Sequence, residues 1–287
     1  MKNFGSLKTP LRYPGGKSRA VNYLGTLLPE RVSAYRDPFV GGGSMALYVT
    51  KNYPWVPVWI NDSYYPLIAF WKNLKDQGSR MALDLLKVKA STYNSIDDQK
   101  KMYNDAKQLI ITGDEYTVGV CFFILNKCSF SGLTESSSFS KQAYDGNFTI
   151  NNIKNLVHYQ KLIKHWKITC TDYSNILKAN WGGHDLEGDF IFLDPPYDIK
   201  ANLYGRDGAQ HKGFSHDKFA EDVKQLEAKF MITYNSNQTI TDLFDTFTLM
   251  EWDLQYTMRS TGTYMKDQKE RKELLITNYV NDKTIER

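Results

Sequence analysis

The stretch Asp189-Phe190-Ile191-Phe192-Leu193-Asp194-Pro195-Pro196-Tyr197 carries more information than any other part of the sequence. Its apolar run predicts a buried strand, and that strand stops abruptly at an acid, two prolines and a tyrosine. The prolines donate no N–H and fix φ, so they predict a stiff corner with free carbonyl oxygens. Open α/β sheets bind ligands at this carboxyl end of their strands. An ordinary turn would explain the prolines, but not the acid and the ring together.

The residues at this corner suit an amino-bearing planar ligand. Asp194 and the carbonyl of Pro195 are both acceptors, and together they can take both hydrogens of an exocyclic amine. Pro196 adds to the stiffness of the corner, and Tyr197 supplies a ring face on which a base can stack. The sequence therefore predicts a site for a nucleobase at the end of this strand.

A glycine-rich turn lies near the N-terminus, in Asp37-Pro38-Phe39-Val40-Gly41-Gly42-Gly43-Ser44. Gly41, Gly43 and Ala46 satisfy G-x-G-x-x-[GA], and Asp62 follows Gly41 by 21 residues, after a second apolar run. This spacing is typical of a nucleotide-binding turn whose following strand ends in an acid that bonds ribose hydroxyls. The pattern alone does not separate NAD from S-adenosylmethionine.

The charge of Asp37 favours S-adenosylmethionine. An acid just before the glycines would repel a pyrophosphate, but it suits a ligand that carries a sulfonium and an ammonium. A second glycine pair, Gly15-Gly16, precedes Lys17-Ser18 and imitates a phosphate-binding loop. However, that motif requires glycine at the position of Leu11. Lys17 is therefore left to bind a carboxylate.

The distribution of residue types predicts one α/β domain interrupted by an insertion. Residues 1–71 and the part after about 165 show short apolar runs separated by turns, which is typical of strands alternating with helices. Residues 72–127 show apolar residues at helical spacing, which predicts about three helices. Residues 128–151 are rich in Ser, Gly and Asn, and they predict a functional loop or a small hairpin.

Three motifs in order, R-Y-P-G-G-K, D-P-F-V-G-G-G-S and D-P-P-Y, resemble the Dam family of S-adenosylmethionine-dependent DNA adenine N6-methyltransferases, alpha group. Residues 123–127 and 131–133 resemble the start of that family's DNA-recognition segment. Residues 169–173 resemble its adenine-contacting turn, and 259–279 resemble its closing hairpin. The resemblance implies a Rossmann-like methyltransferase sheet. A catalytic domain would comprise 1–71 and 165–287, and a helical target-recognition domain would be inserted at 72–164.

The resemblance also implies a role for each matching residue. The catalytic set is Asp194, Pro195, Pro196 and Tyr197. The set around S-adenosylmethionine is Tyr13, Lys17, Asp37, Phe39, Gly41, Gly43, Asp62, Asp172 and Asp194. The set facing DNA is Arg12, Lys127, Phe130, Ser131, Leu133, Glu135 and Arg259. Phe130 would either fill the gap left by a flipped base or fold back onto the helices.

The reaction implied is methylation of an adenine that has left the duplex stack. It yields N6-methyladenine and S-adenosylhomocysteine, and it needs no metal. The resemblance allows the target GATC, but Glu135 stands where GATC-specific members have an arginine that reads guanine. The alternatives are an RNA methyltransferase, a nucleic-acid-binding module without catalysis and, from the glycine turn alone, an NAD-dependent oxidoreductase.

The composition sets wider limits. Lys and Arg number 36 and Asp and Glu 32, so the net charge of +4 permits an anionic partner without requiring one. Three cysteines are too few for a disulfide-rich secreted protein, and their spacing matches no zinc site. The N-terminus shows no secretory signal, and no apolar stretch is long enough to span a bilayer. We expect a cytoplasmic monomer from a bacterium or a phage, acting on double-stranded DNA and not at a membrane.

Overall fold

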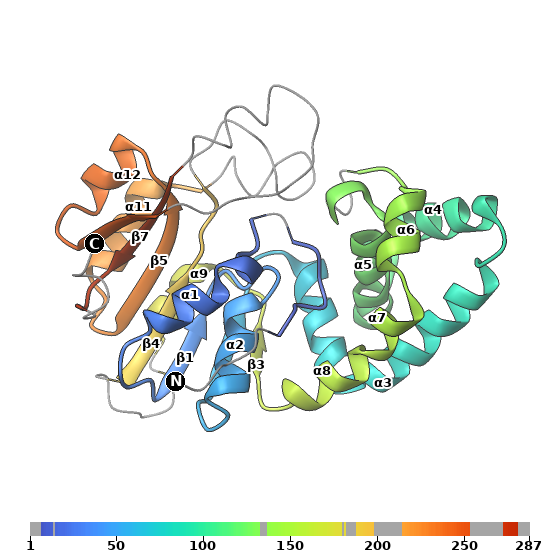
Figure 1. The fold of residues 1–287 in the computed structure, drawn as a ribbon, viewed down its shortest axis with the longest axis horizontal. Helices are drawn as coiled ribbons and strands as arrows, with labels where there is room; N and C mark the ends of the chain where they lie inside the picture. The colour runs from blue at the N-terminus through green and yellow to red at the C-terminus, as the bar shows by residue number, and fades with distance from the viewer. Residues whose placement is uncertain are drawn as a thin grey trace.

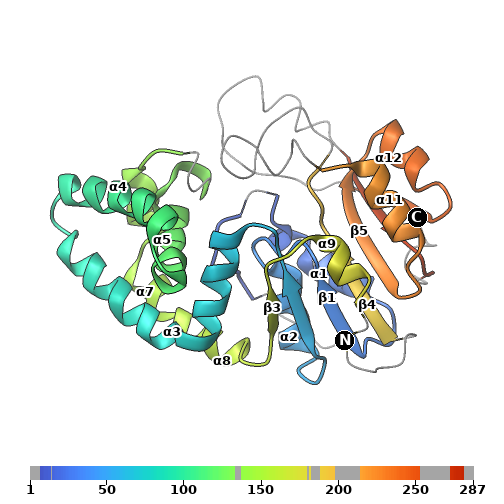
Figure 2. The ribbon, with the colours of Figure 1, turned by 180° about the vertical axis from the view of Figure 1, so that it is seen from behind.

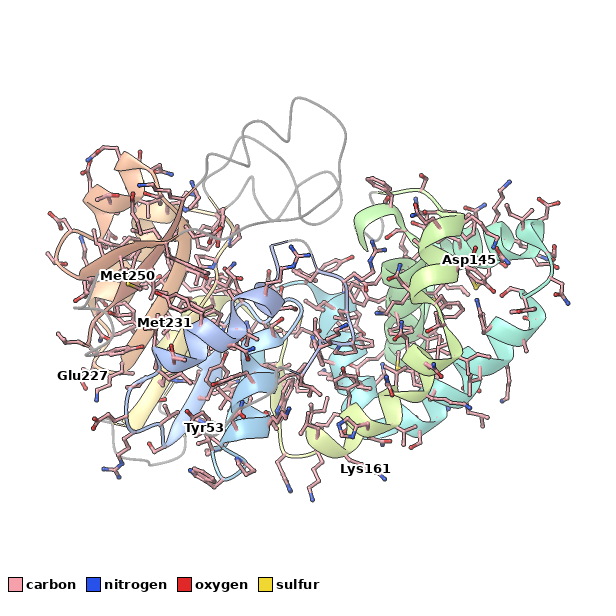
Figure 3. The ribbon with its side chains drawn as sticks, in the orientation of Figure 1. Tyr53, Asp145, Lys161, Glu227, Met231 and Met250 are labelled. Atoms are coloured by element: carbon pink, nitrogen blue, oxygen red, sulfur yellow. The ribbon has the colours of Figure 1, made fainter. Side chains whose placement is uncertain are left out.

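The computed structural model describes residues 7–13, 15–132, 137–179, 181, 188–197, 214–252 and 272–280. Figure 1 shows two parts, a mixed sheet with helices on both faces and a group of helices to one side. Asp145 lies in the helical part, at the far side of the molecule from Met231 and Met250 in the sheet (Figure 3). None of the described helices combines the length and apolar character that a membrane span requires.

Seven strands of the described chain form one sheet in the order β3-β2-β1-β4-β5-β7-β6. The pairs among β1 to β5 are parallel, whereas β7 pairs antiparallel with both β5 and β6. The chain adds β2 and β3 on one side of β1, and β4 and β5 on the other. The strands are β1 (Ala34–Asp37), β2 (Val58–Asn61), β3 (Lys167–Thr169), β4 (Asp189–Leu193), β5 (Lys229–Asn235), β6 (Thr248–Trp252) and β7 (Glu273–Thr277).

The order of strands places a topological switch point between β1 and β4. Open α/β sheets bind ligands beyond the carboxyl ends of the strands at such a point. Asp37 ends β1, and Asp194 directly follows β4. The sequence prediction of an α/β methyltransferase sheet with both motifs at strand ends is confirmed.

Alternate residues of β4 face two different cores, as the period of a strand requires. Phe190 and Phe192 join the larger core with α1 and α2, whereas Ile191 and Leu193 join a second core with α11 and α12. Figures 1 and 2, taken from opposite sides, show these helix groups on opposite faces of the sheet. The elements are η1 (Lys17–Arg19), α1 (Val21–Thr26), α2 (Ser44–Asn52), α9 (Tyr173–Leu177), α11 (His216–Lys224) and α12 (Gln238–Leu243).

The helical part is built around three long helices, which confirms the helical prediction for 72–127. They are α3 (Tyr65–Ser91), α4 (Ile96–Thr112) and α5 (Glu115–Cys128). However, α3 begins before residue 72, so the expected domain boundary falls inside a helix. The helix leaves helical geometry at Gln77, with φ −134° and ψ 25°. Its first turns belong to the sheet part, because the Trp71 indole donates to the Gly41 carbonyl at 3.2 Å.

The prediction of a loop or hairpin over 128–151 is wrong in its second half. Among the described residues of this segment, one isolated antiparallel bridge pairs Ser129 with Phe139, as in a hairpin. The chain then enters helices because Ser140 and Thr149 act as N-caps: Ser140 Oγ accepts from Ala143 N, and Thr149 Oγ1 accepts from Asn152 N. The elements are η2 (Phe130–Gly132), α6 (Lys141–Asn147), α7 (Ile150–Lys154) and α8 (Leu156–Leu162).

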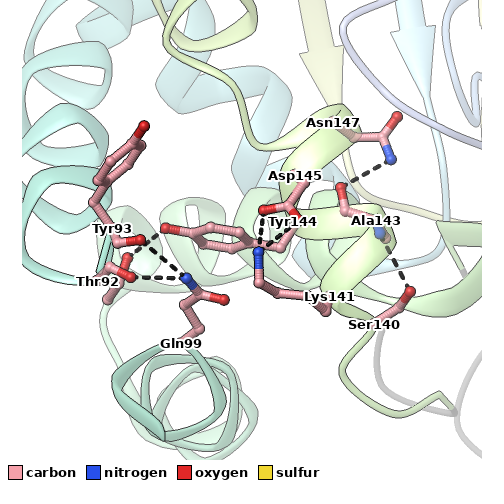
Figure 4. Close-up of polar contacts among 9 residues, drawn as sticks. All are labelled: Thr92, Tyr93, Gln99, Ser140, Lys141, Ala143, Tyr144, Asp145 and Asn147. Carbon is pink, nitrogen blue, oxygen red and sulfur yellow. Dashed lines mark hydrogen bonds and ion pairs between the residues drawn. The ribbon is translucent and has the colours of Figure 1, made fainter. Parts of the chain in front are cut away.

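Polar contacts anchor α6 to the end of α3 (Figure 4). The Tyr144 hydroxyl lies 2.8 Å from Thr92 Oγ1, and the ammonium of Lys89 lies 3.5 Å from the centre of the Tyr144 ring. Gln99 Nε2 donates to the Thr92 carbonyl at 2.9 Å. The polypeptide between α5 and α6 is therefore held at both ends by well-packed helices.

Candidate active site

A cavity of about 470 Å³ lies where the carboxyl ends of β1, β2 and β4 meet, a volume within the range of small-molecule sites. Every residue that the sequence assigned to catalysis or to the cofactor lines this cavity. They are Tyr13, Lys17, Asp37, Phe39, Gly41, Gly43, Asp62, Asp172, Asp194, Pro195, Pro196 and Tyr197. The structure therefore brings together five separate segments of the chain in one cavity.

The glycines of the turn are required by geometry. Gly41 has φ +45° and Gly43 has φ +70°, both in the left-handed region that other residues rarely adopt. A Cβ on Gly41 would lie 2.8 Å from Tyr13 Cε1, and one on Gly43 would lie 2.7 Å from Trp71 Cζ2. The turn can pass between these two rings only because it lacks side chains there.

Asp37 presents an unsatisfied carboxylate oxygen next to the cavity. It is 2% exposed, and its Oδ2 accepts from the Tyr35 hydroxyl at 3.1 Å. Its Oδ1 is buried and has no hydrogen-bond partner among the described residues. Burial raises the pKa of Asp37 well above its ordinary value, and the nearby carboxylates of Asp194 and Asp62 act in the same direction. A cationic ligand would offset this cost.

Asp62 is built into the glycine turn. Its Oδ2 accepts from the Gly41 N–H at 3.2 Å, and its Oδ1 accepts from the Tyr64 N–H at 3.0 Å. Burial raises the pKa of Asp62 to about 6 despite these hydrogen bonds. The position of this carboxylate is therefore set by the same backbone that forms the floor of the cavity.

Asn61, which the sequence prediction missed, joins the loops that follow three neighbouring strands. It is fully buried at the end of β2. Its Nδ2 donates to the Pro38 carbonyl at 3.1 Å and to the Thr171 carbonyl at 2.9 Å, and its Oδ1 accepts from the Thr171 N–H at 3.1 Å. One amide thus fixes the spacing of the loops that carry the acids. An asparagine at the end of an apolar run was the available signal.

The loop after β3 closes another side of the cavity. Asp172 caps α9, because its Oδ1 accepts from the Ser174 N–H at 2.9 Å. The neighbouring Tyr173 stacks on Phe39 with ring centres 5.3 Å apart, and Phe214 packs edge-on against Phe39. An aromatic wall thus stands beside the exposed carboxylate of Asp172.

Asp194 already accepts strong hydrogen bonds. Lys17 Nζ lies 2.7 Å from its Oδ1 and 3.0 Å from its Oδ2, and Thr233 Oγ1 donates to its Oδ1 at 2.6 Å. Lys17 is only 3% exposed and also donates to the Gly15 carbonyl at 3.0 Å. The sequence left Lys17 to bind a carboxylate. In this structure that carboxylate belongs to Asp194 and not to a ligand.

Tyr197 is oriented by residues of β5 and β7. Its hydroxyl donates to Glu273 Oε2 at 2.5 Å, and its ring stacks on Tyr234 with centres 5.9 Å apart. Glu273 is 3% exposed and lies on β7. The sequence prediction did not assign Glu273 a role, because an acid that opens a late apolar run gives no sign of its partner.

The residues predicted to face DNA differ in their surroundings. Phe130 is 55% exposed, which favours a free ring over one packed onto the helices. Lys127 is only 5% exposed, and its ammonium lies 5.4 Å from the Phe123 ring centre. Burial lowers the pKa of Lys127 to about 8. The structure does not present Lys127 to a phosphate. Of the residues predicted to face DNA, those outside the described part of the chain are Leu133, Glu135, Arg259 and the side chain of Ser131.

Comparison with known proteins gives the family of the chain. Residues 13–258 match the family model described as D12 class N6 adenine-specific DNA methyltransferase. The chain is 25% identical to Type II methyltransferase M.MjaIII of Methanocaldococcus jannaschii, over 95% of this chain and 99% of that protein. It is 22% identical to Type II methyltransferase M1.LlaDCHI of Lactococcus lactis subsp. cremoris, over 98% of each. It is 25% identical to a DNA N-6-adenine-methyltransferase of Escherichia phage P1, over 81% of this chain and 30% of that protein.

Proposed function

The chain belongs to the D12 class N6 adenine-specific DNA methyltransferase family and is a DNA adenine methyltransferase, and we propose that its cavity holds S-adenosylmethionine beside a flipped target adenine. The observation that carries the proposal is the meeting in one hollow of two sets of residues. One set suits a cationic nucleoside, and the other suits the amine of a base. The resemblance to Dam enzymes noted from the motifs agrees with this family.

The residues present fit S-adenosylmethionine. The buried, unpartnered Oδ1 of Asp37 suits the ammonium of its methionine moiety, and Asp62 would accept from its ribose hydroxyls. Asp172 and the ring of Phe39 border the place proposed for its adenine. When bound, S-adenosylmethionine supplies a methyl group activated by a sulfonium. The negative charge of Asp37 would stabilise that positive charge, because electrostatic attraction is strong in a site of low dielectric constant.

The amine of the target adenine would be held by Asp194 and the carbonyl of Pro195. Its N6 is a poor nucleophile because its lone pair is delocalised into the ring. Two acceptors that take both amine hydrogens favour a pyramidal nitrogen whose lone pair points at the methyl group. Bound S-adenosylmethionine would supply the methyl group and leave as S-adenosylhomocysteine. Asp194 and the Pro195 carbonyl would hold the amine while N6 is methylated, and the proton that N6 loses would pass to solvent. Positioning and fixed acceptors supply the catalysis.

The ring of Tyr197 would stack on the flipped adenine, and Glu273 would hold that ring at its angle. Duplex DNA is the proposed substrate, because the family is described as DNA-specific. An adenine in a duplex would have to be extruded to reach the cavity. Methylation at GATC would require a residue other than Glu135 to read guanine, since a carboxylate accepts from cytosine N4 instead.

The function is tested by incubating the purified protein with methyl-labelled S-adenosylmethionine and, separately, duplex DNA, single-stranded DNA and RNA. We expect label in duplex DNA, recovered as N6-methyladenine. Transfer confined to RNA would contradict the proposal. Mapping of methylated adenines in DNA from a methylation-deficient host that expresses the protein then gives the recognised sequence, GATC or another.

A further inference from the structure

A short piece of the N-terminal chain lies between the helical part and the cavity. We call residues 8–13 the connecting segment. The Lys8 carbonyl accepts from the hydroxyl of Tyr159 in α8, and Thr9 Oγ1 donates to the carbonyl of Gly42 in the glycine turn. The connecting segment therefore contacts both parts of the molecule. The chain then continues to Lys17, which pairs with Asp194.

The side chain of Asn126, near the end of α5, forms hydrogen bonds with the backbone of the connecting segment. Its Oδ1 accepts from the Arg12 N–H at 2.9 Å, and its Nδ2 donates to the Arg12 carbonyl at 2.7 Å. The same Nδ2 lies 3.4 Å from the Gly132 carbonyl. Asn126 is fully buried, so all three partners depend on this one amide.

The residues after α5 rest directly on Arg12. Gly132 has φ +76°, and a Cβ there would lie 2.5 Å from the Arg12 carbonyl oxygen. Arg12 Nη1 donates to the Ser129 carbonyl at 3.0 Å. The exposed ring of Phe130 lies between these two contacts in sequence. A change in the path of residues 129–132 is therefore transmitted to the backbone of Arg12.

The next residue, Tyr13, is part of the cavity wall. Its ring packs so closely on the glycine turn that a Cβ on Gly41 would lie 2.8 Å from Cε1, and one on Gly42 would lie 2.9 Å from the Tyr13 Cβ. The Tyr13 carbonyl also accepts from the Gly16 N–H at 3.0 Å. Any shift of Arg12 must be accommodated by the floor of the cofactor cavity.

We propose that Asn126 is a positioning residue that couples engagement of duplex DNA by residues 129–132 to binding of the cofactor in the cavity. The proposal rests on the proposed function, since it assigns the exposed segment beside Phe130 to DNA. Coupling of this kind is reciprocal, so DNA raises the affinity for cofactor by the factor by which cofactor raises the affinity for DNA. Coupling factors in proteins are roughly 5–150-fold.

The test measures the dissociation constant of S-adenosylhomocysteine, which cannot be turned over, with and without saturating DNA. The DNA is sheared from a methylation-deficient host, so it contains unmodified targets. For the wild type we expect at least about fivefold tighter binding with DNA. Asn126→Leu should reduce this ratio to less than about twofold, while its affinity without DNA changes little. If that variant fails to fold, Asn126→Ser carries the same expectation, because its smaller side chain admits water to the freed backbone groups.

Asn73→Leu is the matched control. Asn73 is also a buried asparagine, in α3, and its Nδ2 donates to the carbonyls of Ala69 and Glu115 at 2.7 and 2.8 Å, with no such bond to the connecting segment. It should keep the wild-type ratio. A wild-type ratio of one, an unchanged ratio in Asn126→Leu, or an equal loss in Asn73→Leu would overturn the proposal. Methyl transfer is measured separately, with S-adenosylmethionine in place of S-adenosylhomocysteine and the same protein and DNA preparations. Transfer without coupling leaves the function standing, whereas no transfer to DNA defeats both.

Discussion

Lys17 Nζ lies 2.7 Å from Asp194 Oδ1 in an ion pair that joins residues 177 positions apart in sequence. Asp194 Oδ1 also accepts from Thr233, whereas Oδ2 accepts from Lys17 alone among the described residues. Oδ2 is therefore the oxygen with capacity left for the amine of adenine. Lys17 therefore fixes the position of the carboxylate before the base arrives.

Asp194→Asn should reduce methyl transfer at least about a hundredfold, because it removes the charged acceptor for N6. It should also destabilise the chain by about 1–3 kcal/mol, because it leaves the buried ammonium of Lys17 without its counter-charge. Solvent keeps this effect moderate, since the Asp194 side chain is 21% exposed. The two effects are separated by the double variant Lys17→Met with Asp194→Asn. It should recover stability in thermal unfolding but not activity. Recovery of activity with stability would show that the carboxylate has no chemical role.

Gly43→Ala should destabilise the protein by about 1–3 kcal/mol and weaken cofactor binding. The alanine would have to adopt φ +70° and place its Cβ 2.7 Å from Trp71. Gly146→Ala is the control, because a Cβ there meets nothing within 4 Å and the site lies in α6. That change should be neutral or stabilising by up to about 1 kcal/mol. Equal effects of the two variants in thermal unfolding would contradict the geometry of the turn.

The local parts of the fold could be predicted from sequence, whereas its long-range pairings could not. Apolar runs that stop shortly before Asp62 and Asp194 give strand ends, and the motifs give the residues of the cavity. By contrast, Ser140 and Thr149 suggested a loop because the residues that cap helices are also those that form turns. Strand β6 gave no clear pattern, because at the sheet edge all but one of its residues are exposed or only partly buried.

The same limit applies to the site. Residue types identified the acids and the rings, but not their partners. That Glu273 bonds Tyr197, or that Asn126 bonds Arg12, depends on contacts between segments distant in sequence. Burial of Lys127 was equally hidden, because a basic residue at the end of an apolar helix resembles one at its surface.

Cofactor affinity should fall as the pH drops below about 6, because Asp62 must be ionised to accept from ribose hydroxyls and its pKa is raised to about 6. One pH unit below that value corresponds to roughly tenfold. Without ligand the sign is opposite: a raised pKa in the folded state adds stability at acid pH, and that stability is lost as the pH rises through 6. Binding of S-adenosylhomocysteine measured from pH 5 to 8 should show this dependence.

The control for Asp62 is its own uncharged analogue. Asp62→Asn should bind about ten- to a hundredfold more weakly at pH 8. Its remaining pH dependence should be shallower, with the residual slope arising from Asp37, whose pKa is also raised by burial. A pH profile identical to that of the wild type would remove Asp62 from the binding site.

Phe130→Ala should weaken duplex binding and slow methylation, with little change in thermal stability, because the ring is 55% exposed. Stacking between an aromatic ring and bases is worth roughly 1–3 kcal/mol. A mismatch opposite the target adenine should partly restore the rate, since that base flips more easily. Ile111→Ala, which removes a 60% exposed side chain from α4, serves as control and should behave as wild type. An unchanged ratio of rates on mismatched and paired duplexes would exclude the wedge role.

The role of Asp194 as the acceptor of the reacting amine can be tested most directly by mass spectrometry of nucleosides from duplex DNA. The DNA is incubated with S-adenosylmethionine and either the wild type or the Lys17→Met, Asp194→Asn double variant. The wild type should produce N6-methyldeoxyadenosine and no methylated cytosine. The double variant, shown to be folded by its thermal unfolding, should produce at most a hundredth as much, by the argument that transfer depends on the Asp194 acceptor. Comparable N6-methyldeoxyadenosine from both proteins would contradict the claim that Asp194 holds the reacting amine.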